Sequence, residues 1–147
     1  YWLLCCMNMS GVREKMVITI DIEQRITFKE PQITQIIGMS THPDAVYTCI
    51  SLIEQLGGPV MVILDSGHSK ENVLAELNLY AKFVTLGSYL IVEDTNINGN
   101  PVCEGWGDGP KEALDEWLPL HEDEFEIDRE CEQFMLTFNP GGYLRRK

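Results

Sequence analysis

The sequence lacks any long run of apolar residues. Runs such as Val60 to Leu64 are far too short to cross a lipid bilayer. The opening Tyr-Trp-Leu-Leu-Cys-Cys has no basic residues ahead of it, which is unlike a secretory signal. We therefore predict no membrane span and no signal peptide, and we expect a cytoplasmic protein.

Basic residues are scarce as well. The chain has 11 Lys and Arg against 23 Asp and Glu, which gives a formal net charge of -12 at neutral pH. Such an excess of negative charge repels the phosphate backbone of nucleic acids. This composition argues against nucleic-acid binding through a basic face, and small-molecule chemistry fits better.

The five cysteines form no recognisable framework. Cys5 and Cys6 are adjacent, whereas Cys49, Cys103 and Cys131 are scattered. An odd number with this spacing matches neither a set of disulfides nor a zinc site. The 147 residues, 44% of them hydrophobic, are enough to bury a core without cross-links. We expect a single domain that spans residues 1–147.

Segments with strand and helix patterns alternate along most of the chain, which favours a parallel sheet with helical crossovers. After a loop rich in Gly, Asn and Pro, the pattern changes to a predicted pair of strands and a solvated basic tail. The predicted strands are 15–21, 32–38, 60–64, 86–92, 124–128 and 133–138, the helices are 2–9, 43–56, 70–83 and 110–118, the loop is 96–109 and the tail is 143–147.

Carboxylates directly follow two of the predicted parallel strands. Asp65 comes after one, and Glu93 and Asp94 come after the next. The carboxyl ends of parallel strands meet at one edge of the sheet, so these side chains should cluster and could bind a hard divalent cation. The alternative is that they cap helices or shape turns. The adjacent Glu93–Asp94 pair favours the metal, because neighbouring carboxylates repel one another without a cation.

His68 follows Asp65 by three residues, near the turn into the next predicted helix. An imidazole titrates near neutral pH, which suits a general base. The alternative is a capping or packing role for this histidine.

Four strings of residues resemble a known family. They are D-S-G-H-S at 65–69, V-E-D-T-N-I-N-G at 92–99, G-D-G-P at 107–110 and F-N-P-G-G-Y-L-R-R at 138–146. Together they resemble the cephalosporin hydroxylase and rhamnosyl O-methyltransferase family of class I S-adenosylmethionine-dependent methyltransferases. The resemblance covers nearly the whole chain after about Val17. Several separate motifs in one order are more specific than a lone glycine pattern.

The resemblance implies an α/β fold, a Rossmann-like, doubly wound, mostly parallel sheet with an antiparallel C-terminal strand. It implies Mg²⁺ at Asp65, Glu93 and Asp94, and His68 at a position where related methyltransferases have a Lys or His as base. The expected reaction is methyl transfer from S-adenosylmethionine to a hydroxyl of a sugar or antibiotic-like small molecule. Hydroxylation is not expected, because the sequence has no convincing iron triad.

Two residues are candidates for contacts with the cofactor. Asp21 ends a predicted strand, where a carboxylate can accept hydrogen bonds from both ribose hydroxyls. Ser40 follows the next strand, where the resembling family tends to have a small polar or acidic group near the adenine. The alternatives are a turn acid for Asp21 and an ordinary loop residue for Ser40.

The sequence departs from the family at its start. It begins at Tyr1, and the first strand with its acidic, glycine-rich turn is absent. We expect an N-terminally truncated fragment with a gap in the sheet, for which homo-oligomer formation and cofactor binding are open questions. Two other functions remain open. One is a non-catalytic Rossmann-like module that binds a metal or a partner, and the other is a metal-dependent hydrolase that uses the same carboxylates.

Overall fold

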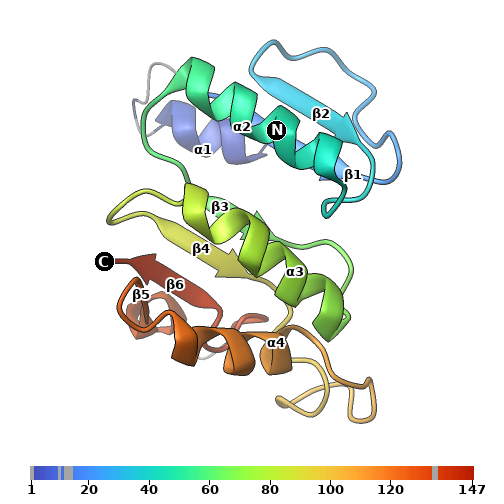
Figure 1. Ribbon diagram of the computed structural model, residues 1–147, viewed down its shortest axis with the longest axis vertical. Helices are drawn as coiled ribbons and strands as arrows, with labels where there is room; N and C mark the ends of the chain where they lie inside the picture. The colour runs from blue at the N-terminus through green and yellow to red at the C-terminus, as the bar shows by residue number, and fades with distance from the viewer. Residues whose placement is uncertain (1, 10, 12–14, 134–135) are drawn as a thin grey trace. The chain divides into compact units, whose positions relative to one another are not determined.

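The computed structural model describes residues 2–9, 11, 15–133 and 136–147. The chain divides into two compact units, Tyr1–Gly58 and Pro59–Lys147, and each is described by itself (Figure 1). The expectation of a single domain stays a prediction. Among the described residues, no helix combines the length and the apolar character needed to cross a membrane.

The first unit holds a two-stranded parallel sheet and two helices. Strands β1 (Val17–Asp21) and β2 (Ile33–Ile37) pair in a register that places Val17 opposite Ile33. Helix α1 covers Trp2–Met9, and α2 covers Pro43–Leu56. The four elements agree with the prediction to within two residues at each end.

Local chemistry sets both ends of α2. Pro43 occupies the first turn, where its missing N–H costs nothing. The His42 side chain accepts a hydrogen bond from the Asp44 N–H at 3.3 Å. At the other end Gly57, with φ of 63°, donates its N–H to the Ile53 carbonyl. The predicted bounds of this helix are therefore confirmed.

The second unit holds a four-stranded sheet in the order β3-β4-β6-β5 (Figure 1). Strands β3 and β4 are parallel, and β6 is antiparallel to both of its neighbours. In this sheet, β3, β4 and β5 therefore run in one direction and β6 in the other. This arrangement confirms the predicted α/β fold with an antiparallel C-terminal strand. The strands are β3 (Val62–Leu64), β4 (Tyr89–Val92), β5 (Phe125–Ile127) and β6 (Tyr143–Arg146).

The predicted C-terminal pair of strands is wrong in one member. The partner of β5 is β6, a segment predicted to be a solvated tail, and residues 136–138 form no strand. Phe134 and Met135 of the predicted strand lie outside the described residues. This segment joins the sheet, where the apolar side chain of Leu144 becomes fully buried. The Arg146 guanidinium donates to backbone carbonyls, including that of Val84 at 2.8 Å, which satisfies its polar groups.

Two helices lie side by side in the second unit, α3 (Lys70–Tyr80) and α4 (Pro110–Trp117) (Figure 1). Short 3-10 turns extend both, at Ala81–Phe83 and Leu118–Leu120, and a third covers Arg129–Glu132. The Trp117 indole donates to the Asn78 side chain at 3.1 Å and joins the two helices. Leucines of the helices and of the sheet form the core of this unit: Leu77, Leu90, Leu114 and Leu144.

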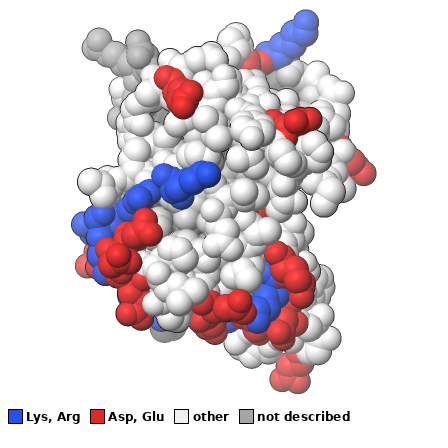
Figure 2. Space-filling model, in the orientation of Figure 1, with Lys and Arg blue, Asp and Glu red and all other residues white. Residues whose placement is uncertain are grey.

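Acidic side chains are exposed on α4, at Asp115 and Glu116, and at the start of α3, at Glu71. Figure 2 shows Asp and Glu gathered over α4 and near the start of α3, with basic side chains among them, whereas most of the surface over α3 is uncharged. The Lys70 ammonium, for example, lies 2.8 Å from the Glu116 carboxylate. The net negative charge found in the sequence is therefore present on this face of the second unit.

Candidate active site

The carboxyl ends of β3 and β4 lie next to each other in the sheet. The parallel register places Leu64 opposite Val92, and the Glu93 N–H continues the pairing by donating to the Leu64 carbonyl at 3.0 Å. Asp65 directly follows β3, and Asp94 follows Glu93. The backbone therefore brings all three predicted carboxylates to one edge of the sheet.

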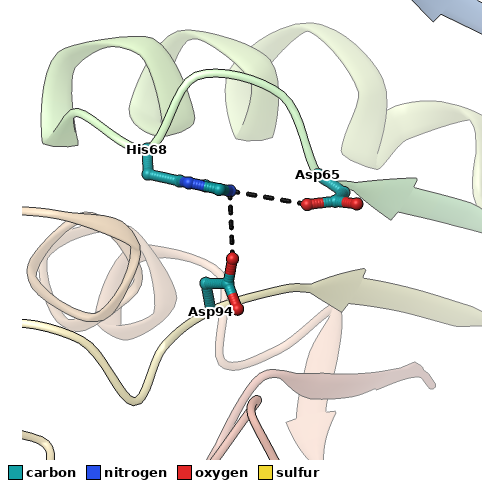
Figure 3. Close-up of side chains that lie close together, drawn as sticks. All are labelled: Asp65, His68 and Asp94. Carbon is teal, nitrogen blue, oxygen red and sulfur yellow. Dashed lines mark ion pairs between the residues drawn. The ribbon is translucent and has the colours of Figure 1, made fainter. Parts of the chain in front are cut away.

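The His68 side chain reaches the carboxylates from the turn after β3 (Figure 3). Its Nε2 atom lies 3.4 Å from Asp65 Oδ1 and 3.3 Å from Asp94 Oδ2. One ligand atom from each residue lies within 4.8 Å of the other two. Nε2 is shielded from solvent and has no hydrogen-bond partner of good geometry among the described residues. The imidazole is therefore aimed between two carboxylates without being fixed to either.

The pKa of the Glu93 carboxyl reflects the negative charges that lie near it. Burial raises the pKa of the Glu93 carboxyl, and the nearby carboxylates of Asp65 and Asp94 raise it further, whereas His68 acts in the opposite direction. Both effects disfavour the ionised form of Glu93. A cation at this edge of the sheet would relieve the repulsion.

The chemistry of this donor set fits Mg²⁺. Mg²⁺ prefers carboxylate oxygens and keeps several positions for water or substrate, and Asp65 and Asp94 offer oxygens toward a common point. Among the described residues, the ligand atoms that converge are those of Asp65, His68 and Asp94, and Glu93 is not one of them. The role of Glu93 as a ligand stays a prediction, and its raised pKa shows that it feels the charges of Asp65 and Asp94. An imidazole nitrogen is a poorer ligand for so hard an ion, so His68 would lie beside such an ion and not bind it.

The turn that carries Asp65 and His68 is anchored to α3. The Ser66 hydroxyl donates to Glu76 Oε1 at 2.6 Å, and the Asn72 amide donates to Ser66 Oγ and to the Gly67 carbonyl. Glu76 is only 2% exposed. The sequence analysis missed this residue, because a single Glu within a helical pattern gives no sign that it is buried beneath a loop.

The two candidate cofactor residues lie in the first unit. Asp21 is the last residue of β1, where its carboxylate accepts from the Glu23 N–H at 2.9 Å and pairs with Arg25 at 2.9 Å. These are contacts of a turn acid, and ribose binding would have to displace or share them. Ser40 lies in the turn between β2 and α2. The roles of Asp21 and Ser40 stay predictions.

Comparison with known proteins gives a family match along almost the whole chain. The family model for rhamnosyl O-methyltransferase/CmcI matches residues 3–147. A rhamnosyl O-methyltransferase of Mycobacterium tuberculosis is 38% identical over 119 residues, which cover 80% of this chain and 49% of that protein. The Mycobacterium leprae rhamnosyl O-methyltransferase is 36% identical over 135 residues, 89% of this chain and 59% of the relative.

A solved structure is similar at lower identity. It is the MycE methyltransferase from the mycinamycin biosynthetic pathway, in complex with Mg, SAH and mycinamycin VI, with 20% identity and a TM-score of 0.48. The match covers 74% of this chain and 27% of that chain. The present chain spans about half the length of the curated rhamnosyl O-methyltransferases it matches. By the family match, this chain belongs to the rhamnosyl O-methyltransferase/CmcI family.

Proposed function

We propose that the protein containing this chain is an Mg²⁺-dependent O-methyltransferase. It would transfer a methyl group from S-adenosylmethionine to a hydroxyl of a sugar or antibiotic-like small molecule. The observation that carries the proposal is the convergence of the Asp65, His68 and Asp94 side chains at the ends of β3 and β4. Family membership and the name of the curated relatives support the reaction type.

The proposed mechanism assigns a task to each side chain. Asp65, Glu93 and Asp94 would hold Mg²⁺, which when bound supplies positive charge that makes a neighbouring hydroxyl more acidic. His68 Nε2 would accept the proton of that hydroxyl. The hydroxyl oxygen then forms a bond to the methyl carbon while the carbon–sulfur bond breaks, and sulfur keeps the electron pair as the neutral thioether.

The position of His68 suits the role of general base. Its Nε2 lies 3.4 Å from Asp65 Oδ1 and 3.3 Å from Asp94 Oδ2, so the imidazole is beside the oxygens that would hold the metal. Nε2 makes no hydrogen bond to the described residues, and binding of the substrate would have to open the solvent-shielded side of this atom to the hydroxyl. The base and the metal ligands would therefore act on the same substrate oxygen.

The proposal is tested with the full-length protein and a rhamnosyl acceptor. We expect formation of S-adenosylhomocysteine that depends on both acceptor and Mg²⁺. His68→Ala and Asp65→Asn should each lower kcat/KM by about 10²-fold or more, because proton transfer and metal binding are both lost. Asp115→Asn is the matched control, since Asp115 is an exposed residue of α4 that pairs with Lys111.

Calorimetric titration with S-adenosylmethionine, with and without Mg²⁺, separates this proposal from its rivals. A non-catalytic module would show no heat of cofactor binding in either case. A metal-dependent hydrolase would turn over its substrate in the absence of the sulfonium compound. Either result would contradict methyl transfer.

A further inference from the structure

A turn near the C-terminus, Asn139–Gly142, packs against the end of β4. The Gly142 N–H donates to the Asn139 carbonyl at 2.9 Å, and the Val92 N–H donates to the Gly142 carbonyl at 2.8 Å. A Cβ atom on Gly142 would lie 2.2 Å from the Val92 carbonyl oxygen, so only glycine fits there. The turn is therefore held at a fixed distance from the residues that follow β4.

Asp94 has a backbone conformation that needs such support. Its φ angle is 54°, in the left-handed region that residues other than glycine adopt at an energetic cost. A conformation of this kind persists only where the surroundings enforce it. The direction in which the Asp94 carboxylate points depends on this conformation, because φ and ψ fix the Cα–Cβ bond relative to the strand.

The Asn139 side chain supplies the support. Its Oδ1 accepts a hydrogen bond from the Asp94 N–H at 2.9 Å, although the two residues are 45 positions apart in sequence. Asn139 is only 7% exposed, and its own N–H donates to Thr137 Oγ1 at 3.0 Å. The Thr137 hydroxyl in turn lies 3.0 Å from the Tyr143 hydroxyl. The hydrogen bond to Thr137 therefore holds the Asn139 backbone in place, while the Asn139 side-chain oxygen accepts the hydrogen bond from the Asp94 N–H.

We infer that Asn139 is a positioning residue for the proposed active site. By holding the Asp94 peptide in the left-handed conformation, it keeps the Asp94 carboxylate 3.3 Å from His68 Nε2 and turned toward Asp65. One consequence, that Asn139 sets the affinity for the metal, rests on the proposed function. The hydrogen bond itself can be tested without a metal.

The same turn offers a matched control. The Thr95 hydroxyl donates to the Pro140 carbonyl at 3.0 Å, and Thr95 is fully buried. Thr95→Val keeps the side-chain shape and removes one buried hydrogen bond between the turn and the end of β4. It leaves the bond from Asn139 to Asp94 in place. A general loosening of the turn should therefore appear in both Thr95→Val and Asn139→Ala, whereas misplacement of Asp94 should appear only in Asn139→Ala.

The first measurement is amide hydrogen exchange in the metal-free full-length protein. We expect Asn139→Ala to lower the protection of the Asp94 amide by tenfold or more. The Glu93 amide, which bonds to the Leu64 carbonyl, should keep its protection. Unchanged protection of the Asp94 amide would overturn the inference.

The second measurement is Mn²⁺ affinity, followed by the paramagnetic signal of the free ion. Asn139→Ala should weaken Mn²⁺ binding by about tenfold, as is typical when a group that orients a metal ligand is lost. Thr95→Val should stay within twofold of wild type. Equal losses in both variants, or none in Asn139→Ala, would overturn the inference. If the wild-type protein bound no Mn²⁺, the proposed function would fail, and amide exchange would still decide the role of Asn139.

Discussion

Gly142 illustrates how little space the backbone leaves beside the candidate site. Any side chain there would overlap the Val92 carbonyl oxygen, because a Cβ atom would lie 2.2 Å away. We therefore expect Gly142→Ala to lower the free energy of unfolding by about 2 kcal/mol or more, as over-packing forces the backbone to shift. Denaturant unfolding would show this as a lower midpoint. Gly67→Ala is the control, since its new Cβ would meet Asn72 at an ordinary contact distance of 3.5 Å.

A second residue-scale feature is the hydrogen bond from the Tyr89 hydroxyl to Asp128 Oδ2 at 2.6 Å. This bond is the largest cause that raises the pKa of Tyr89 to about 12, and it also lowers the pKa of Asp128. A raised tyrosine pKa stabilises the fold below the unfolded value of about 10, and the effect is lost as pH rises through the folded value. A lowered carboxyl pKa stabilises the fold at pH values above the unfolded pKa of about 4. This stabilisation is lost as the pH falls through the pKa of the carboxyl in the folded protein.

The expected result is a plateau in the difference between wild type and Tyr89→Phe. Wild type should be more stable by a constant amount between about pH 5 and pH 9, and the difference should shrink outside this range. Urea titrations at a series of pH values would measure it. A difference that is largest at the extremes of pH would contradict the assignment of the bond.

At the scale of single residues, the sequence indicates which acidic residues lie at the candidate site, but not which residues hold them in position. Asp65, Glu93, Asp94 and His68 stand out because polar residues end apolar strands, and the fold brings them to one edge of the sheet. Their roles stay predictions. Asn139 could not be inferred to contact Asp94, because no local pattern connects residues so far apart. The only signal was its place in a string that resembles the family.

At the scale of elements, the start of α3 determines where the turn with His68 lies. The Ser69 side chain caps the helix by accepting a hydrogen bond from the Asn72 N–H at 3.3 Å. Ser69→Ala should lower the free energy of unfolding by about 1 kcal/mol, because a helix N–H loses its partner. Thermal unfolding would measure the loss. Ser88→Ala, in the loop before β4, is the matched control and should change stability by less than about 0.5 kcal/mol.

The accuracy of the predicted elements follows from how local their signals are. Helix α2 has a proline at its start, a glycine at its end and apolar residues at helical spacing, so its bounds could be predicted. Strand β6 has only four residues, two of them arginines, and it becomes a strand because β4 and β5 lie on either side of it. A strand was wrongly predicted at Leu136 and Phe138, because these apolar residues are 93% and 73% exposed and not buried in a sheet.

At the scale of the whole chain, the two units differ in how much core they bury. In Tyr1–Gly58 the buried apolar residues that are described come only from α2, and its sheet has two strands. A sheet of two strands is marginally stable by itself. In Pro59–Lys147 the described residues form a four-stranded sheet, the helices α3 and α4, and a core with fully buried leucines. Independent stability is therefore expected of the second unit and not of the first.

This difference predicts how two separate fragments, one for each unit, should behave. Asp65, His68, Glu93 and Asp94 all belong to Pro59–Lys147, as does Asn139, whereas Asp21 and Ser40 belong to Tyr1–Gly58. We expect the 59–147 fragment to unfold cooperatively and to bind Mn²⁺ more tightly than its Asp65→Asn variant. The 1–58 fragment should show no cooperative transition in circular dichroism. The prediction is wrong if 59–147 lacks a transition, or if Asp65→Asn leaves its Mn²⁺ affinity unchanged, because the carboxylates would then need more than this unit to bind a cation.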